Sequence, residues 1–262
     1  MILIGEKLNS SIPKTLEAFE KTDEAAVVKL IEMQAQAGAS YLDINTAVCE
    51  DELDKMLWII QLVQKHSDCG IMIDSTSSDI IKKAAAAVSN RPLMINSTTI
   101  TERFDTVVPL ALEKGASIVA LPIDDDGMPK TLEEKCDKID LLVSKLRRAG
   151  MEDEKIFVDV LIETLATDME SAKTAIGAID YIIKTYPSIN TTCGLSNISF
   201  GLPKRALINT AFVSAAMVVG LSSAILDPSS PSMRAALAAG QVVAGQDDYC
   251  MNYINYIREM EE

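Results

Sequence analysis

Asp and Asn residues recur directly after short apolar runs along this chain, and they are the side chains best able to do chemistry. Carboxylates accept hydrogen bonds, whereas carboxamides both donate and accept them. The polar positions that follow the apolar runs are Glu6, Lys7, Asn9, Asp43, Asn45, Asp74, Ser75, Asn96, Ser97, Asp124, Asp159, Ser196, Asn197 and Asp227. Such a set suits a flat heterocycle that carries several N–H donors and ring acceptors.

The residues that the chain lacks exclude several other kinds of chemistry. His66 is the only histidine, and it lies at the polar end of an expected helix, where we predict a solvated position. A Ser-His-Asp triad, a multi-histidine zinc site and an H-E-x-x-H protease all need more histidines. The five cysteines show no C-x-x-C spacing, which favours neither a disulfide framework nor a zinc site. We therefore expect no protein-bound metal.

The charge balance argues against nucleic acid as a partner. The chain has 38 acidic and 24 basic residues, which give a net charge of −14. This charge repels a phosphate backbone, and only 5% of the residues are aromatic and able to stack on bases. We therefore predict no nucleic-acid partner.

The hydropathy pattern predicts a cytoplasmic protein with no membrane partner. Apolar residues make up 48% of the chain, which is ample for a full core. The longest uncharged run, 206–226, could span a bilayer, but polar residues interrupt it, so we expect a buried helix and strand there. The segment from Met1 to Lys7 lacks the basic start and cleavage site of a signal peptide.

Short apolar runs alternate with amphipathic stretches from one end of the chain to the other. The expected strands are 2–4, 41–44, 71–73, 93–95, 118–121, 156–160, 191–195 and 223–226. Each precedes a helical pattern, as in Asp23 to Ala37 and in Leu132 to Leu146. Eight such units predict an α/β fold, the (β/α)8 TIM barrel. An open doubly wound sheet is the alternative, but its nucleotide-binding form needs G-x-G-x-x-G after the first strand, and none occurs there.

Local signals mark the ends of several expected helices. Gly38, Gly115 and Gly150 lie where helices should stop, and Thr131 with Glu134 has the spacing of a capping box. No linker interrupts the chain, so we predict one domain over residues 1–262. The segment 227–262 is expected to form two helical pieces that close the last unit. In such a barrel the C-terminal strand ends line the active-site mouth, where the polar residues would meet.

A turn-rich segment near residue 200 indicates a ligand-binding loop. It runs Gly194-Leu195-Ser196-Asn197-Ile198-Ser199-Phe200-Gly201-Leu202-Pro203, and its small residues let another molecule approach the backbone closely. The segment resembles the signature of the pterin-binding methyltransferases that work with corrinoid proteins. That family includes the methyltetrahydrofolate:corrinoid iron-sulfur protein methyltransferases and the folate domain of cobalamin-dependent methionine synthase.

The resemblance extends over essentially the whole chain. The other similar motifs are Gly5-Glu6-Lys7-Leu8-Asn9, Leu42-Asp43-Ile44-Asn45, Ile73-Asp74-Ser75, Met94-Ile95-Asn96-Ser97 and Val158-Asp159. Lys7 departs from the family's usual arginine, and lysine offers a point charge in place of a forked contact.

The resemblance implies tetrahydrofolate as a substrate and cobalamin or another corrinoid, carried by a partner protein, as the other half of the reaction. By that match Asp74, Asn96 and Asp159 bind the pterin, and Asn197 lies near N5, where the methyl group sits. One carboxylate can accept the adjacent N3–H and 2-amino donors of the pterin, and Asp159 is the candidate. Asn9, Asp43, Asn45 and Ser196 complete the predicted substrate-binding set.

The predicted reaction is methyl transfer between N5 of tetrahydrofolate and the cobalt of the corrinoid protein. Positive charge must build on N5 when the methyl group leaves, by protonation or strong hydrogen bonding. Asn197 is the predicted catalytic residue, because its carbonyl can stabilise that charge or its amide can donate to N5. The protein would supply orientation and electrostatics, and the sequence leaves the direction of transfer open.

Two other functions stay open at this stage. Dihydropteroate synthase shares the pterin-binding barrel, but it opens with Asn-Val-Thr-Pro-Asp-Ser-Phe, whereas this chain has Asn9-Ser10-Ser11-Ile12-Pro13. A folate-binding barrel without transfer activity is the second. A corrinoid carrier needs a D-x-H-x-x-G loop, which the surroundings of His66 do not provide.

One segment bears on assembly. Residues 211–219 are apolar nearly all round, more than an outer barrel helix needs if its other face meets water. A partner surface would explain this composition. The resemblance also implies a homodimer, with the corrinoid protein approaching the open mouth of the barrel.

Overall fold

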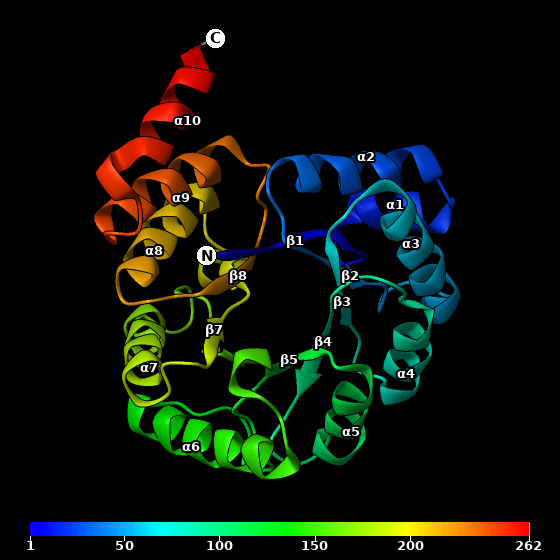
Figure 1. Ribbon diagram of the computed structural model, residues 1–262, viewed down its shortest axis with the longest axis horizontal. Coiled ribbons are helices and arrows are strands. Elements are labelled where there is room, and N and C mark those ends of the chain that lie inside the picture. Colours follow the sequence, from blue (N-terminus) through cyan, green and yellow to red (C-terminus); the bar gives the residue numbers. More distant parts are fainter. Residues whose placement is uncertain (262) are drawn as a thin grey trace.

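Eight parallel strands form the inner wall of the protein in a computed structural model that describes residues 1–261 (Figure 1). The strands are β1 (Ile2–Asn9), β2 (Tyr41–Asn45), β3 (Gly70–Asp74), β4 (Leu93–Thr98), β5 (Ser117–Ala120), β6 (Ile156–Asp159), β7 (Asn190–Thr192) and β8 (Ser223–Leu226). They follow chain order, with β8 beside β1. Ile225 N donates to Cys193 O (2.9 Å) between β8 and the end of β7, which closes the ring. The predicted TIM barrel is confirmed.

Helices surround this wall. They are α1 (Pro13–Glu20), α2 (Glu24–Gln36), α3 (Glu52–His66), α4 (Ser78–Ala87), α5 (Phe104–Lys114), α6 (Leu132–Ala149), α7 (Ser171–Thr185), α8 (Arg205–Val218), α9 (Pro231–Val243) and α10 (Met251–Glu261). Short 3-10 turns are η1 (Asp153–Lys155), η2 (Leu195–Ser199) and η3 (Asp248–Cys250). The segment predicted as a binding loop is therefore wound into η2 over its first half.

The predicted helix signals act as expected. Thr131 Oγ1 accepts from Glu134 N (3.1 Å), and Glu134 Oε2 accepts from Thr131 N (3.3 Å), so the capping box at the start of α6 is present. Gly115 and Gly150 end α5 and α6 in the left-handed conformation, which glycine adopts at little cost.

Side chains inside the barrel are arranged in two layers. An apolar layer lies toward the N-terminal ends of the strands, and a polar layer lies at their C-terminal ends. The alternation of side chains along each strand sends successive residues to opposite faces. The apolar layer consists of Ile4, Met72, Met94, Val119 and Phe157. Two residues further along the same or neighbouring strands come Glu6, Asp43, Asp74, Asn96 and Asp159, which form the polar layer. The barrel is thus sealed below and polar at its C-terminal mouth.

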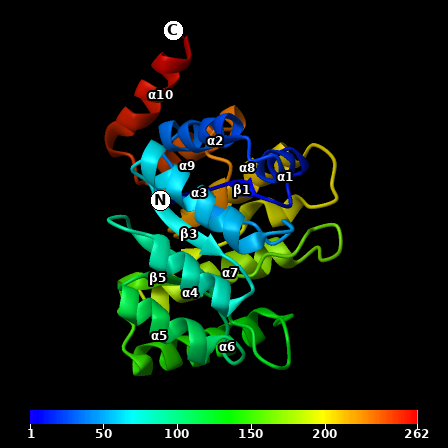
Figure 2. The ribbon, with the colours of Figure 1, turned by 90° about the vertical axis from the view of Figure 1, so that its right-hand side faces the viewer.

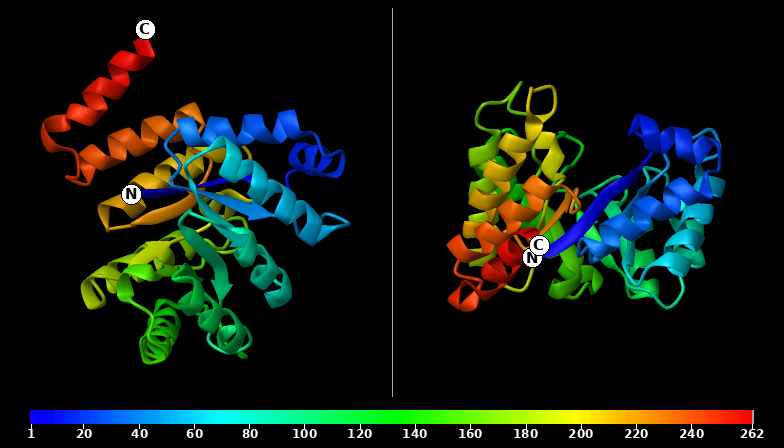
Figure 3. Two further views of the ribbon diagram at one scale, coloured as in Figure 1. Left: turned by 45° about the vertical axis from the view of Figure 1, so that its right-hand side comes forward. Right: turned by 90° about the horizontal axis from the view of Figure 1, so that it is seen from above.

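The C-terminal segment differs from the prediction that both of its helices close the barrel. Only α9 does so, and it packs along α8. A side-chain carbon added to Gly240 of α9 would lie 2.8 Å from Met217 Sδ of α8, which shows how closely the two helices approach. By contrast, α10 contacts α9 and η3 and projects away from the barrel (Figures 1 and 2, and Figure 3, left).

The close packing of α8 against α9 also explains much of the apolar segment 211–219. Phe212, Val213, Ala216 and Met217 are buried within the chain, so they need no second protein to cover them. Val218 remains exposed.

His66 is less solvated than predicted. Its side chain is 25% exposed, its Nδ1 lies 4.0 Å from Glu32 Oε1, and its Nε2 is buried without a hydrogen-bond partner among residues 1–261. The cause is the packing of α2 against α3, a contact that the polar residues around His66 in the sequence do not reveal.

Candidate active site

A cavity of about 490 Å³ opens at the C-terminal ends of the strands, a size typical of small-molecule sites. All of the predicted site residues except Asn45 line it. The lining residues are Glu6, Lys7, Asn9, Ser11, Ile12, Asp43, Asp74, Asn96, Asp159, Gly194, Ser196, Asn197, Arg205 and Ile225. The fold therefore brings together polar side chains that are up to about two hundred residues apart in the sequence.

Asn45 does not line the cavity but contacts Asp74, which does. Its Nδ2 donates to Asp74 Oδ2 (2.7 Å), and its Oδ1 accepts from Ala47 N (3.1 Å). Burial raises the pKa of Asp74, while the hydrogen bond from Asn45 and the charge of Arg103 oppose that rise. Asn45 thus orients Asp74 and does not face the ligand space itself.

Asp43 is the least satisfied polar group of the cavity. Its side chain is 3% exposed, and its Oδ1 has no hydrogen-bond partner among the described residues. Burial, together with the negative charges of Asp74 and Glu6, raises its pKa well above the ordinary value. The Asp43 carboxyl therefore holds a proton readily and can donate a hydrogen bond to a ligand as well as accept one.

Glu6 is tied to the loop that carries Asn197. Ser196 Oγ donates to Glu6 Oε1 (2.9 Å), a contact between the end of β1 and η2. Burial raises the pKa of Glu6, against the hydrogen bond from Ser196 and the charge of Lys7. Ser196 therefore links η2, which follows β7, to β1 across the intervening β8.

Arg205 is a cavity residue that the sequence prediction missed. Its Nη2 donates to Ser196 O (2.5 Å) and its Nε to Ser199 Oγ (3.0 Å), so it fastens η2 to the start of α8. Its only signal in the sequence is a basic side chain shortly after the turn-rich segment, and surface arginines are too common for that to single it out.

Asp159 is an acid whose charge state changes near neutral pH. Burial raises its pKa to about 6, although the hydrogen bond from Leu161 N and the charge of Lys135 act in the opposite direction. Leu161 N donates to Asp159 Oδ1 at 2.8 Å. At pH 7 and above the group is mainly a carboxylate, which can accept a pair of ligand donors.

Asn197 lies at the exposed rim of the cavity. Its main chain is fixed, because Asn197 N donates to Gly194 O (3.0 Å) and Asn197 O accepts from Phe200 N (3.1 Å). Its side-chain amide makes no hydrogen bond within residues 1–261, which leaves both its donor and its acceptor free for a ligand. A side-chain carbon added to Gly194 would lie 3.0 Å from Asn197 Nδ2, so Gly194 keeps space for this amide.

Other strand-end residues serve the loops or the rim. Asp124 accepts from Lys138 Nζ and from Asp126 N (3.0 Å), away from the cavity. Asp227 forms an ion pair with Lys7 (Nζ to Oδ2, 2.8 Å). Asn9 lines the cavity while its Oδ1 accepts from Ser11 N (2.8 Å) in the turn after β1.

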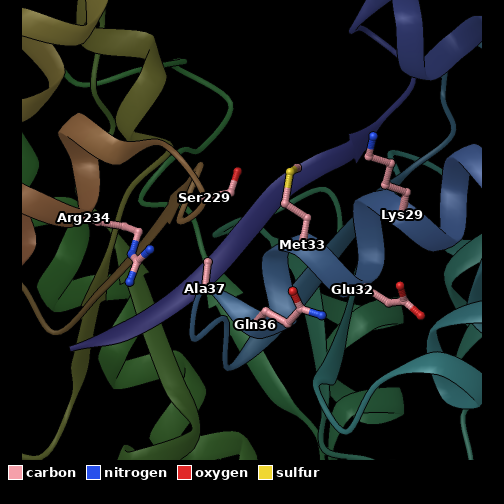
Figure 4. A pocket seen from close by; sticks show the side chains of 7 residues that line it. All are labelled: Lys29, Glu32, Met33, Gln36, Ala37, Ser229 and Arg234. Atoms are coloured by element: carbon pink, nitrogen blue, oxygen red, sulfur yellow. The ribbon is translucent and has the colours of Figure 1, made fainter. Parts of the chain in front are cut away.

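A second hollow lies on the outside of the barrel, over β1 (Figure 4). Figure 4 shows α2 with Lys29, Met33 and Ala37 on one side of β1, and Ser229 and Arg234 on the other. None of the predicted site residues lines it, and we assign the chemistry to the cavity at the mouth.

Within residues 1–261, no group of three or more His, Cys, Asp or Glu residues is arranged to hold a metal ion. Over the same residues, the helices are too short or too polar to cross a membrane.

A TIM barrel with a ring of carboxylates and carboxamides at its mouth defines a class of α/β-barrel protein that binds a small polar ligand. Residues 5–227 match the family described as pterin binding enzyme. The chain therefore belongs to the pterin-binding enzyme family, and the resemblance seen in its motifs is confirmed.

Two named proteins are similar to this chain over most of its length. The chain is 34% identical to the methylcorrinoid:tetrahydrofolate methyltransferase of Eubacterium limosum over 99% of this chain and 97% of that protein. It is 30% identical to the methionine synthase of Mycobacterium tuberculosis over 87% of this chain, but the match spans only 20% of that larger protein.

Solved structures with the same fold include the 7,8-dihydropteroate synthase of Vibrio fischeri ES114, with a TM-score of 0.73, 18% identity, and coverage of 94% of this chain and 93% of that one. The dihydropteroate synthase of Coxiella burnetii in complex with pteroic acid gives a TM-score of 0.70 at 15% identity, with 93% of each chain covered. At these identities the likeness shows the barrel fold alone.

Proposed function

We propose that this protein is a methyltransferase that moves a methyl group between N5 of tetrahydrofolate and the cobalt of a corrinoid protein. The observation that carries the proposal is the full-length similarity to a relative named for this reaction. The polar layer at the barrel mouth supports it, because a tetrahydropterin presents the N–H donors and ring acceptors that such a layer can match. The same site would serve either direction of transfer.

The pterin would be held by the inner acids. In its ionised form Asp159 accepts the N3–H and 2-amino donors as a pair, and Asp74 and Asn96 contact the other ring nitrogens and the oxygen. The unpartnered Oδ1 of Asp43 supports this arrangement, because a buried polar atom without a partner is costly and a ligand donor would satisfy it.

Catalysis would centre on Asn197. Its amide is free of protein hydrogen bonds among residues 1–261 and lies at the rim, where the methyl group must be open to the cobalt. A fixed polar group next to an atom that gains charge stabilises the transition state more than the ground state. The corrinoid, carried by the partner, supplies the cobalt that takes or gives the methyl group.

Exposed apolar side chains around the mouth support a protein partner on this face. Val48 follows β2, Met128 follows β5, Met169 follows β6, and Phe200 and Leu207 follow β7. Exposed apolar groups that gather around a site are typical of interaction surfaces. We propose that the corrinoid protein binds this mouth surface, defined by these residues.

We further propose a homodimer formed through α10. Tyr249, Met251, Ile254 and Met260 are exposed on or next to this helix, and Val243 is exposed at the end of α9. An 11-residue helix is marginal by itself in water, so a helix with so little support from its own barrel gains from a second copy. Light scattering at micromolar concentration tests this, and a monomer would contradict it.

The transfer reaction itself is tested by mixing the purified protein with methylcobalamin and tetrahydrofolate and following the corrinoid spectrum. We expect demethylation of the corrinoid and formation of methyltetrahydrofolate. Tight folate binding with no spectral change, even with a methylated corrinoid protein, would instead indicate a folate-binding barrel without transfer activity. Formation of dihydropteroate from a pterin pyrophosphate and p-aminobenzoate would favour the dihydropteroate synthase alternative.

A further inference from the structure

Lys135, in the first turn of α6, is a buried cation that the proposed chemistry does not use. Its side chain is 4% exposed. It forms no ion pair within residues 1–261, and its Nζ donates to two main-chain oxygens, Val160 O (2.9 Å) and Leu161 O (2.8 Å). Burying an ammonium group is costly, so a lysine kept in this position calls for a reason beyond packing.

The two oxygens belong to the turn that directly follows Asp159. Val160 N donates to Thr192 O (3.1 Å), which continues the pairing of β6 with β7. Leu161 then has a φ of +53°, a left-handed conformation that residues other than glycine adopt rarely. In this conformation Leu161 N donates to Asp159 Oδ1. The ammonium of Lys135 therefore fastens the peptide units that fix the carboxylate.

We propose that Lys135 is a positioning residue for Asp159, which holds the turn at residues 160–161 so that the carboxylate faces the folate. This inference rests on the proposed function, because it takes Asp159 as the pterin-binding acid. Lys135 does not line the cavity, so it acts through Asp159 and not on the ligand.

The charge of Lys135 has a second consequence. It favours the ionised form of Asp159 and so opposes the effect of burial on the Asp159 pKa. Cys193, directly after β7, lies near Asp159, and Glu163 and Asp168 lie near Lys135. Because Lys135 is the cation in this group, loss of its charge should raise the Asp159 pKa further and move the loss of folate binding to higher pH.

Three variants separate position from charge. Lys135→Met removes both the charge and the hydrogen bonds, Lys135→Gln keeps a donor without the charge, and Lys135→Arg keeps both. Lys138→Met is the matched control, because Lys138 lies one turn along the same helix but bonds to Asp124 and Gly127 O away from the cavity. Circular dichroism establishes which variants are folded, and Lys135→Gln decides the question if Lys135→Met is not.

Two measurements read out the effect. The first is the tetrahydrofolate dissociation constant by calorimetry from about pH 5.5 to 8.5; the second, made without folate, is the titration of the Asp159 carboxyl by carbon NMR, identified by its loss in Asp159→Asn. We expect Lys135→Met and Lys135→Gln to raise the Asp159 pKa by about one unit, which should weaken binding about twofold at pH 7 and about eightfold at pH 5.5. Lys135→Arg should bind within about 1.5-fold of the native protein at both pH values.

A folded Lys135→Gln with native Asp159 titration and native affinity would overturn the inference, and so would an equal shift in Lys138→Met. If the native protein binds no folate, the proposed function fails. The NMR titration still decides whether Lys135 sets the state of Asp159, so the two failures are distinguishable.

Discussion

In the proposed function Asp159 must be ionised to accept two pterin donors, yet its burial favours the neutral form. The hydrogen bond from Leu161 N and the charge of Lys135 both lower the Asp159 pKa, so they oppose the effect of burial. Replacement by Asn removes the proton equilibrium and also places a donor against one of the pterin donors.

We predict that Asp159→Asn weakens tetrahydrofolate binding by about 2 kcal/mol or more, measured by calorimetry at pH 7.5. The free energy of unfolding of the Asp159→Asn variant at that pH should not be lower than that of the native protein. A carboxyl whose pKa is raised on folding costs stability once it is ionised, above about pH 6, and Asn avoids that cost. Unchanged affinity would remove Asp159 from the pterin site.

The pH dependence of binding follows from the same pKa. Because the ionised form binds, tetrahydrofolate affinity should be greatest above about pH 7 and should fall as the pH decreases through about 6, where free Asp159 takes up its proton. Calorimetry in a pH series measures this. In Asp159→Asn the remaining pH dependence reports only the ligand and the other acids, and a native-like profile there would contradict the assignment.

Asn197 should affect the rate more than binding. We predict that Asn197→Ala lowers the transfer rate by on the order of 10²–10³, because one preorganised polar contact at a charge-developing atom is lost. Binding of unmethylated tetrahydrofolate should change little, since Asp74, Asn96 and Asp159 remain. Rapid-mixing rates and equilibrium binding on one preparation test this, and equal losses in both would make Asn197 a binding residue only.

Among the elements, η2 carries Asn197 and is held in place by side-chain contacts to two other elements. It is fastened by Ser196 to Glu6 and by Arg205 to Ser199, while Gly194 leaves room for the Asn197 amide. These contacts fix the main chain of the turn and leave the Asn197 amide without a hydrogen-bond partner among residues 1–261. The element thus presents one unpaired amide from a fixed main chain.

We predict that Gly194→Ala lowers the transfer rate by about tenfold or more, because the new methyl group displaces the Asn197 amide by a few tenths of an ångström. Stability should change by less than about 1 kcal/mol, since φ at Gly194 is −74° and the crowded amide is at the exposed rim. A double-mutant cycle provides the control. If Gly194→Ala acts through Asn197, it should add nothing to Asn197→Ala.

At the scale of the whole molecule, the exposed apolar side chains of the mouth surface surround the polar cavity. Met169 is 83% exposed in the loop after β6, and Leu207 is 67% exposed in the first turn of α8. Such a rim would bring a corrinoid protein over the pocket while leaving the pterin contacts untouched. The molecule would then separate recognition of the partner from recognition of the folate.

We predict that Met169→Glu with Leu207→Glu lowers kcat/KM for a methylated corrinoid protein by about tenfold, because the charges must be desolvated in the interface. Transfer from free methylcobalamin should stay within about twofold. Leu112→Glu, at an exposed position in the last turn of α5 away from the mouth, is the control and should leave both unchanged. An equal loss with free methylcobalamin would show damage to the pocket.

The sequence by itself determined the barrel and the composition of its mouth. Apolar strand runs, helix caps such as Thr131 with Glu134, and a polar residue after nearly every strand are local features, because strand and helix periodicity act over a few residues. In a parallel barrel all strand ends meet at one face, so Asp74, Asn96 and Asp159 could be assigned to one site before any coordinates.

Only the tertiary structure decided which of these side chains face the cavity and how burial and neighbouring charges shift their pKa values. Asp124 forms an ion pair with Lys138, and Asn45 donates a hydrogen bond to Asp74. Ser196 donates a hydrogen bond to Glu6, which lies 190 positions away in the sequence. The buried Lys135 and its hold on the turn after Asp159 have no signal in the sequence. Hydrogen bonds and burial depend on distances between elements that meet only when the ring of strands closes, and these distances set the pKa values as well.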